Sequence, residues 1–497
     1  MLCWTRRPYL RVPQAGPVSI PQTRKNAMKY ARVFLLSLAF SAISVLAQPN
    51  SVALLYQPLI PASVEPGHSA FVLTVRGTGF VNGAIVVADG VPLRTRFVSS
   101  STLKADVLAQ FVRQPRTASV TVLNPGSIAS NVIFFPVRDP AKRVRMGLDS
   151  HFNAPQYAGV ATGDFNNDGK LDIVACQQYN HLWTASLSLG KGDGTFQVPI
   201  ETDFPDLSQL GFNGITTGDF NGDGRLDLAA YWYQGSSSGT LIMLNNGDGT
   251  FTDLPFFYST YFTSFADLNQ DGKLDATGTN NDQGFPGLGV YLGNGDGTFT
   301  QANVDINPSA LLSFVGLSLF GDFNGDGRLD IAISGTDRFS GSAAVAVYLQ
   351  NMDGTFQNGV DYLTSHGGQG LLIADVNGDG RADLITDACV LLGAGDGTFH
   401  QGGCPDAGSG IVSAALGDFN GDGKLDLVDM GDGLQVMLGN GDGSFQSPID
   451  FLAVCGNFPP LFHYGPILGD VNHDGRLDLV EACMNPAPLL GVQKPSN

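Results

Sequence analysis

A nine-residue pattern of the type Asp-x-Asn-x-Asp-Gly-x-x-Asp occurs seven times in this chain of 497 residues. Every copy carries oxygen-bearing side chains at positions one, three, five and nine, and a glycine at position six. Calcium prefers about six to eight oxygen ligands at roughly 2.3–2.6 Å, and alternate side chains on a tightly turned loop converge on one point. The pattern therefore predicts Ca²⁺ binding at up to seven loops.

The predicted calcium ligands are the four oxygen-bearing side chains of each copy. They are Asp164, Asn166, Asp168 and Asp172; Asp219, Asn221, Asp223 and Asp227; Asp267, Asn269, Asp271 and Asp275; Asp322, Asn324, Asp326 and Asp330; Asp375, Asn377, Asp379 and Asp383; Asp418, Asn420, Asp422 and Asp426; and Asp470, Asn472, Asp474 and Asp478. Position seven is always Lys or Arg, so we expect it to offer its carbonyl oxygen and to turn its side chain outward. The alternative is seven solvated acidic turns without metal, but carboxylates at this spacing repel one another unless a cation is present.

An EF-hand loop shares the first six positions of the pattern, but it closes with a Glu at position twelve. Only the last two copies carry an acid at that position, Asp429 and Glu481. The flanking segments, of the type Gly-Asp-Phe before and Leu-Asp-Leu after, are typical of strands rather than helices. We therefore expect a loop between two strands, closed by the Asp at position nine.

A second pattern, of the type Leu-Gly-x-Gly-Asp-Gly-Thr-Phe, follows each of the first six copies. Asn, Gly and Asp between two strand-like runs indicate a hairpin, because such turns need positive φ. We interpret its aspartates as turn residues rather than as further ligands: Asp193, Asp248, Asp296, Asp353, Asp396 and Asp442.

The spacing of the copies, which begin 43 to 55 residues apart, indicates a repeat architecture. Repeats of this length are typical of propellers and solenoids, since one unit cannot bury its apolar face alone. The 64 glycines and the low charged content of 15% fit many short strands and tight turns. The net charge of −19 argues against a nucleic acid or an anionic membrane as partner, although seven Ca²⁺ would offset most of it.

An export signal is predicted at residues 28–47, where Lys29 and Arg32 precede an apolar stretch that ends in a small-residue cleavage site. Residues 1–27 are then an upstream extension. No later apolar run is long enough to span a bilayer. We therefore expect a secreted or cell-surface protein, with no membrane insertion after signal cleavage.

Five cysteines follow the predicted cleavage site, and an exported setting favours their pairing. The odd number leaves one cysteine over. From their positions in one or two adjacent repeats we expect the pairs Cys389–Cys404 and Cys455–Cys483.

Residues 50–138 contain no metal pattern, but they show strand-like runs broken by Gly, Pro and Asn, as in a small β-sandwich. This segment resembles bacterial TIG/IPT domains, which are immunoglobulin-like modules. The resemblance rests on Val75-Arg-Gly-Thr-Gly-Phe80, Phe97-Val-Ser-Ser-Ser-Thr-Leu103 and Val120-Thr-Val-Leu-Asn-Pro-Gly126. It implies a spacer or interaction unit, and residues 139–143 are the expected linker to the repeats.

Residues 144–497 resemble the FG-GAP/VCBS repeat family, whose propeller also occurs in integrin α subunits. The resemblance rests on Gly-Asp-Phe-Asn-Gly-Asp-Gly-(Arg/Lys)-Leu-Asp at 218–227, 321–330 and 417–426. It implies an all-β chain in which an immunoglobulin-like β-sandwich precedes a seven-bladed β-propeller. Four strands are expected in each repeat: one ends at Gly-Asp-Phe, one follows Leu-Asp, one ends at Leu-Gly and one begins at Thr-Phe. The last repeat lacks its Thr-Phe strand, and Met146–Pro155 can take that place and close the ring.

Up-and-down strands place the calcium loops and the Gly-Asp-Gly turns on one face of such a propeller. Connections on the opposite face vary, and variable loops on a rigid scaffold commonly bind ligands. The candidate ligand-binding residues are aromatic residues and one histidine in those connections: Tyr179, Trp183, Tyr231, Trp232, Tyr233, Tyr258, Tyr261, Phe462, His463 and Tyr464. Exposed aromatic rings can stack on sugars or anchor a protein partner, whereas the alternative is that they pack between blades.

These patterns favour a secreted, calcium-stabilised propeller that acts in adhesion or binds a glycan or protein ligand. Calcium is expected to have a structural role. Two alternatives stay open: a polysaccharide-active, lyase-like enzyme on the same scaffold, and a purely structural cell-surface component. The chain has no His-Glu-x-x-His motif and no phosphate loop, and no catalytic residue is assigned.

Overall fold

The fold is known for the parts of the chain that the computed structural model describes. These are residues 51–140, 148–149, 157–179, 182–207, 210–234, 237–258, 260–280, 287–302, 304, 306, 312–337, 342–364, 370–386, 389–404, 414–429, 434–451, 467–470, 476–480 and 490–491. In these ranges the regular elements are strands and one 3-10 turn, η1 (Pro205–Leu207), with no α-helix. The prediction of an all-β chain is confirmed. The predicted signal at residues 28–47 and the extension at 1–27 lie outside the described residues.

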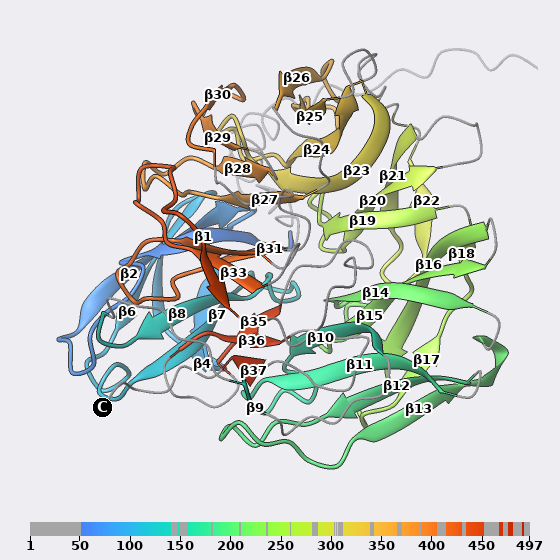
Figure 1. Cartoon of the computed structure of the whole chain (residues 1–497), viewed down its shortest axis with the longest axis horizontal. Helices are drawn as coiled ribbons and strands as arrows, with labels where there is room; N and C mark the ends of the chain where they lie inside the picture. Colours follow the sequence, from blue (N-terminus) through green and yellow to red (C-terminus); the bar gives the residue numbers. More distant parts are fainter. Residues whose placement is uncertain are drawn as a thin grey trace, which may run out of the picture. The chain divides into compact units, whose positions relative to one another are not determined.

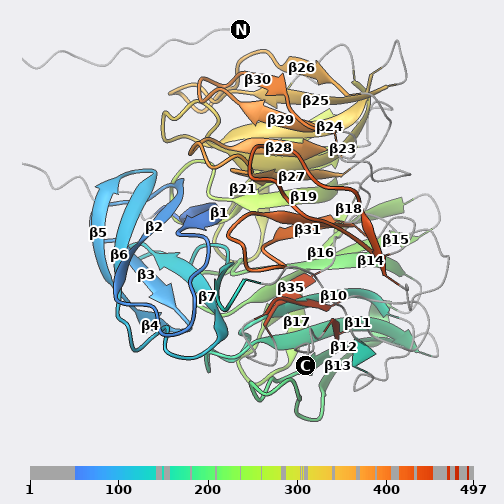
Figure 2. The same ribbon diagram turned by 60° about the vertical axis from the view of Figure 1, so that its left-hand side comes forward.

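Residues 51–138, called here the N-terminal segment, form two antiparallel four-stranded sheets (Figure 2). The sheets, in strand order, are β1 (Leu54–Ile60), β2 (Phe71–Thr78), β6 (Thr102–Val107) and β5 (Arg94–Ser99), and β4 (Val91–Pro92), β3 (Ile85–Ala88), β7 (Arg116–Leu123) and β8 (Ile133–Val137). Alternate residues point inward, so Leu73 and Val75 of the first sheet share one core with Val86 and Val120 of the second. The resemblance to TIG/IPT modules stays an interpretation of this two-sheet arrangement.

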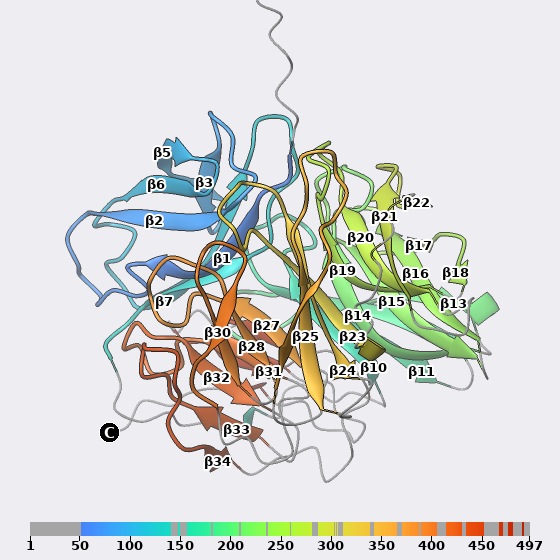
Figure 3. The same cartoon turned by 90° about the horizontal axis from the view of Figure 1, so that it is seen from above.

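The repeats form a succession of antiparallel sheets, most of them four-stranded (Figures 1 and 3). In chain order the sheets are β10 (Tyr157–Gly163), β11 (Asp172–Tyr179), β12 (Leu182–Ser188) and β13 (Ile200–Phe204); β14 (Gly211–Gly218), β15 (Asp227–Gln234), β16 (Ser237–Asn245) and β17 (Phe251–Asp253), with β18 (Phe257–Tyr258) also beside β16; β19 (Thr260–Ala266), β20 (Asp275–Asn280), β21 (Gly287–Gly293) and β22 (Phe299–Gln301); β23 (Leu312–Gly321), β24 (Asp330–Asp337), β25 (Ala343–Tyr348) and β26 (Val360–Leu363); β27 (Leu371–Ala374), β28 (Asp383–Thr386), β29 (Val390–Gly393) and β30 (Phe399–Gln401); β31 (Ala414–Gly417), β32 (Asp426–Asp429), β33 (Leu434–Met437) and β34 (Ile449–Phe451); and β35 (Ile467–Gly469), β36 (Asp478–Val480), β37 (Leu490–Gly491) and β9 (Leu148–Asp149).

The nine-residue pattern forms the connection between the first two strands of each sheet, as predicted. The first strand ends immediately before position one, and the second begins at the Asp of position nine. In the following text these connections are called motif loops one to seven, in chain order. The turn after the third strand lies at the same end of the sheet, because Gly190 in that turn donates its N–H to Oδ1 of Asp172 at 2.8 Å.

The fourth strand follows the prediction in only three of the six sheets that carry the second pattern. Strands β17, β22 and β30 begin at the Phe of Thr-Phe. In the other three sheets this Phe makes an isolated bridge, and the strand begins later, at β13, β26 and β34. Pro199 and Pro448 stand directly before two of these later strands, and a proline cannot donate a ladder hydrogen bond.

The last sheet takes its fourth strand from the segment that precedes the first motif. Strand β9 pairs with β37 through Leu148 opposite Gly491 and Asp149 opposite Leu490. The pairing predicted for part of Met146–Pro155 is therefore confirmed. Strand β10 of the first sheet also contacts β35 of the last. A closed seven-bladed propeller stays a prediction, which these two contacts support.

Neighbouring sheets are joined by shared apolar cores and by backbone hydrogen bonds. Val174 and Leu187 of the first sheet pack in one cluster with Leu228 and Leu241 of the second. The carbonyl at position two of a motif loop accepts a hydrogen bond from the next sheet; for example, the amide of Gly297 donates to Phe220 O at 2.9 Å. Where this hydrogen bond is present, a sheet therefore holds the motif loop of the preceding sheet in place.

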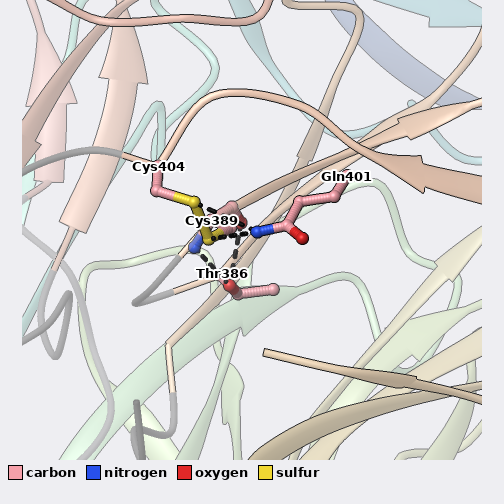
Figure 4. The surroundings of a disulfide bond; sticks show 4 residues. All are labelled: Thr386, Cys389, Gln401 and Cys404. Carbon is pink, nitrogen blue, oxygen red and sulfur yellow. Dashed lines mark hydrogen bonds between the residues drawn. A yellow bond between two sulfur atoms is a disulfide. The ribbon is translucent and has the colours of Figure 1, made fainter. Parts of the chain in front are cut away.

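One disulfide joins Cys389 and Cys404, which confirms one of the two predicted pairs (Figure 4). The side-chain amide of Gln401 lies 3.2 Å from Sγ of Cys389 and 3.3 Å from Sγ of Cys404. Cys176 is a buried free cysteine of the described residues. The predicted partners Cys455 and Cys483 lie outside the described residues.

The Asp at position nine fastens each described loop to its sheet. In loop four, the fully buried Asp330 accepts the amide of Phe323 at 2.9 Å through Oδ2 and the amide of Gln350 at 2.8 Å through Oδ1. The same two bonds recur in loops one, two, three, five and six. A carboxylate is the side chain that satisfies both buried donors at once.

We expect Asp330→Ala to lower the free energy of unfolding by about 2–4 kcal/mol, because it leaves two buried N–H groups without an acceptor. Urea unfolding in excess chelator measures this effect without any contribution from metal. Asp353→Ala is the matched control, since Asp353 lies in the exposed turn after the third strand of the same sheet. Equal midpoints for the two variants would contradict the fastening role.

Candidate functional site

The six motif loops that are described in full share one backbone conformation. Position six is a glycine with positive φ in every one, from 82° at Gly169 to 91° at Gly272 and Gly380. Position four also has positive φ, both as Gly in four loops and as Asn167 (58°) and Gln270 (61°). The requirement at position four was not predicted, although the recurrence of Gly there was a visible signal for it.

Side-chain oxygens at positions one, three and five bind the loop's own amides. In loop four, Asp322 accepts the amides of Asp326 at 3.0 Å and Gly327 at 2.9 Å. Asn324 Oδ1 accepts the amide of Asp326 at 2.9 Å, and Asp326 Oδ1 accepts that of Arg328 at 2.9 Å. The other five loops repeat these bonds. The bonds hold three oxygen-bearing side chains in a fixed relation on each loop.

The carboxylates of a loop make one another harder to ionise. Burial raises the pKa of Asp330 to about 7, and the nearby charges of Asp322 and Asp326 add to the effect, against the two amide bonds that lower it. Position nine behaves alike elsewhere: its pKa is raised, chiefly by burial, to about 6 at Asp172 and about 7 at Asp227, Asp275, Asp383 and Asp426. Burial also raises the pKa of the position-one carboxyls in loops one to six, for example Asp322. A cation bound in the loop would relieve this unfavourable charge.

The aspartates of the second pattern behave as turn residues, as predicted. Oδ1 of Asp193 accepts the amide of Thr195 at 2.9 Å and its hydroxyl at 2.6 Å, and the same pair of bonds recurs at the other five turns. These bonds, led by the hydroxyl, hold the pKa of Asp193 below its usual range. Such a carboxylate is exposed and already satisfied at the turn.

The side chain at position seven was expected to point outward and to offset part of the loop's charge; in loops two and four it offsets that charge by folding back onto the loop. Arg225 forms an ion pair with Asp223 at position five, and Arg328 does so with Asp326. Nε of Arg225 also donates to Asn245 O at 3.0 Å, in the turn after the third strand. Because two residues on a tight loop are close neighbours, the guanidinium folds back onto the nearest carboxylate instead of pointing into solvent.

The donor set of the loops fits calcium. Carboxylate, amide and carbonyl oxygens are the hard ligands that Ca²⁺ prefers, and no soft sulfur or imidazole ligand occurs in the pattern. Within the described residues, no three His, Cys, Asp or Glu side chains are gathered into a metal-holding group. Each predicted site includes three Asp side chains, at positions one, five and nine, and in loops one to six both oxygens of the position-nine Asp accept buried amides. Calcium ligation stays a prediction in all loops, and in loop seven Asn472 and Asp474 lie outside the described residues.

The motif-loop end of the sheets is in contact with the N-terminal segment, which the sequence did not predict. The amide of Val52 donates to Oδ2 of Asp267 at 2.7 Å, and that of Thr117 donates to Oδ2 of Asp470 at 2.7 Å. The amide of Asp322 in turn donates to the Tyr56 hydroxyl at 2.7 Å. Position one of several motif loops is therefore also a docking point inside the molecule.

A cavity of about 180 Å³ lies between the N-terminal segment and the first strands of three sheets. Leu55 and Ile133 line it from the N-terminal segment, and Phe265, Phe320 and Ile373 line it from β19, β23 and β27. Its lining is both polar and apolar, with Tyr56, Gln57 and Asn131 beside the apolar side chains, and it contains no predicted ligand-binding residue.

Three of the aromatic residues predicted to bind a ligand are buried instead. Trp183, Tyr231 and Trp232 are 5%, 2% and 1% exposed, and the two tryptophans belong to the core shared by the first two sheets. The indole N–H of Trp183 donates to Leu210 O at 2.7 Å. These large rings fill the space between strands, so the alternative interpretation, packing between sheets, holds for them.

Two predicted aromatic residues remain accessible at the end of the sheets opposite the motif loops. Tyr233, near the end of β15, is 45% exposed. Tyr261 is partly exposed and stacks on Tyr231 of the preceding sheet, with ring centroids 5.8 Å apart. The side chains of Tyr179 and Tyr258, and residues Phe462, His463 and Tyr464, lie outside the described part of the structure.

Comparison with solved structures finds other proteins of very low sequence identity. An auxiliary nutrient binding protein from Bacteroides ovatus ATCC 8483 is 11% identical, with a TM-score of 0.32, over 86% of this chain and 97% of the other. One from Bacteroides thetaiotaomicron VPI-5482 is 11% identical, with a TM-score of 0.29 and the same coverage. A putative phosphatase from Bacteroides thetaiotaomicron VPI-5482 is 10% identical, with a TM-score of 0.21, over 68% and 95%. These scores carry no argument about what this chain binds or catalyses.

Comparison with protein families is more specific. No curated protein matches the chain. The FG-GAP-like repeat matches residues 164–230, 267–333 and 322–386, which include motif loops one to five. The chain therefore contains FG-GAP-like repeats, and each matched stretch includes two of the motif loops that carry the candidate calcium ligands.

Proposed function

We propose that this protein is an exported, calcium-stabilised β-propeller that binds a glycan or protein ligand at the end of the sheets opposite the motif loops. The observation that carries the calcium part is the identical hydrogen-bonded array of Asp, Asn and Asp in loops one to six. Six copies of one array, each with a carboxyl whose pKa is raised by burial and further by neighbouring carboxylates, are explained by a shared cationic ligand.

A structural role for calcium follows from where the loops are fastened. Position nine ties each described loop to the turn after the third strand, and position two ties some loops to the next sheet. Charge repulsion in a loop therefore acts directly on the contacts that join sheets. Neutralising it would stabilise the whole succession of sheets without any reacting group.

Ligand binding is assigned to the opposite end because the motif-loop end is partly occupied. Val52, Tyr56 and Thr117 of the N-terminal segment already contact three motif loops. At the other end, the exposed Tyr233 and the stacked Tyr261 offer ring surface next to polar groups. Export is supported by the disulfide Cys389–Cys404, since such bonds persist in oxidising compartments. No helix able to cross a membrane is found in the described residues.

Calcium should raise the melting temperature of the full chain relative to excess chelator. One site at a free calcium concentration a hundredfold above its dissociation constant contributes about 2.7 kcal/mol, and several loops add to this. Asp223→Ala should remove one site and reduce the calcium-dependent shift, whereas the turn variant Asp248→Ala should not. Differential scanning calorimetry tests this, and a melting temperature that ignores chelator would overturn the calcium assignment.

The metal-free protein should be more stable at pH 5.5 than at pH 8. The folded-state pKa of Asp227 and Asp330 is raised to about 7, so the folded state holds protons that the unfolded chain releases above about pH 4. This stability is present below pH 4 and is lost as pH rises toward 7. With calcium, the dependence should reverse, because protons and Ca²⁺ compete for the same carboxylates. Melting curves in chelator and in calcium at both pH values provide the measurement.

Tyr233→Ala should weaken ligand retention without changing the melting temperature, because its ring is exposed and lies away from the core. A glycan array, and capture of proteins from the exterior of the producing cell, measure retention. Met352→Ala is the control: Met352 is 89% exposed but lies in a turn at the motif-loop end. If the two variants retain ligand equally well, Tyr233 is not part of the binding surface.

A further inference from the structure

Two motif loops already hold a cation, which comes from the N-terminal segment. In loop five, Nη1 of Arg76 lies 2.7 Å from Oδ2 of Asp375, and these side chains are 28% and 6% exposed. The amide of Asp375 also donates to Gln57 O at 2.8 Å. Gly380, at position six, has a φ of 91°, and a Cβ there would lie 2.8 Å from the Arg76 guanidinium. The loop is thus shaped around this arginine.

Loop six receives a second arginine, in a more buried setting. Nη2 of Arg138 donates to the carbonyl oxygen of Asp418 and lies 3.5 Å from its Oδ1. The two side chains are only 6% and 4% exposed. A buried carboxylate beside a buried guanidinium is compensated before any metal binds, and neither charge can be removed alone without cost.

Loops one and two differ from loops five and six at position one. In the described residues, Asp164 and Asp219 accept hydrogen bonds only from amides of their own loops. In loop three, Asp267 accepts the backbone amide of Val52, whereas in loop seven Asp470 accepts the amide of Thr117 and also interacts electrostatically with Arg116. The seven copies of the pattern are therefore nearly identical in sequence but differ in their electrostatic surroundings.

We infer that Arg76 and Arg138 serve as internal cations of loops five and six, so that these two loops bind calcium more weakly than loops one and two, and that calcium binding there opposes docking of the N-terminal segment. The inference rests on the proposed calcium sites. It deepens that proposal by setting loops five and six, whose position-one carboxylate lies beside an arginine of the N-terminal segment, apart from loops one and two.

The physical basis is competition for the same negative charge. Oδ2 of Asp375 binds Arg76 and the amide of Gly380, while Oδ1 accepts the amide of Asp379. A Ca²⁺ entering this loop meets a carboxylate whose charge the guanidinium already offsets, and its own charge repels the guanidinium. The coupling is reciprocal: the factor by which Arg76 weakens calcium binding equals the factor by which bound calcium weakens the docking contact of Arg76.

The test is a calcium titration of the full chain, with the metal removed beforehand, by isothermal calorimetry. The wild type should show at least two classes of site. Arg76→Gln should move one site from the weak to the strong class, with binding tighter by at least about tenfold, because the removed unit charge no longer repels Ca²⁺ at the carboxylate. Arg76→Lys should behave like the wild type, because it keeps the charge. Arg96→Gln is the matched control, since Arg96 is 57% exposed and pairs with Asp106, away from every motif loop.

A second readout guards against a variant that merely folds poorly. The melting temperature of Arg76→Gln should fall below that of Arg96→Gln in chelator, and the gap should narrow in saturating calcium. Binding isotherms that are the same for Arg76→Gln and Arg96→Gln would overturn the inference while leaving the calcium sites standing. If the wild type binds no calcium, the proposed function fails and the inference fails with it.

Discussion

The structure depends on one constraint: carboxylates crowded on a tight loop must each be given a donor or a cation. The Asp at position nine meets it by accepting two buried amides, one from its own loop and one from the turn after the third strand. Positions one, three and five meet it with amides of the loop itself. What remains is net negative charge, which adds to burial in raising the pKa at position nine. The features of the motif-loop end described above, including the folded-back arginines and the docked N-terminal segment, place positive charge or N–H groups around that remainder.

Much of the fold could be predicted because the same local sequence patterns recur in each repeat. The Asp of position nine begins a strand in every sheet, and the Gly-Asp-Gly turns bind their own Thr or Ser as expected. Where the prediction failed, distant context decided the outcome. The fourth strand starts late where Pro199 or Pro448 interrupts the ladder, and Trp183 and Trp232 are buried because two neighbouring sheets need large rings between them. A single sequence does not show which face of a strand its neighbour will cover.

The residues that make up the candidate site could be predicted from the sequence, but the residues that surround it could not. The spacing alone indicates a candidate ligand set, which stays a prediction, and the glycines at position six turn as expected. The roles of Arg76 and Arg138 were not visible, because they lie far from the loops along the chain and belong to strands whose pattern indicates only a small two-sheet module. Contacts between two segments depend on how their folded surfaces fit together. Neither segment carries a periodic sequence pattern that predicts such contacts.

The pairing of β9 with β37 has a consequence for the order in which this molecule can be assembled. The ribosome makes Leu148 and Asp149 before any of the repeats, whereas their partners Leu490 and Gly491 are made after all seven motif loops. The earliest strand of the repeats must therefore wait, with its edge unpaired, until the seventh repeat has emerged. A chain truncated or stalled before β37 would leave that edge exposed, since β37 supplies the strand that covers it.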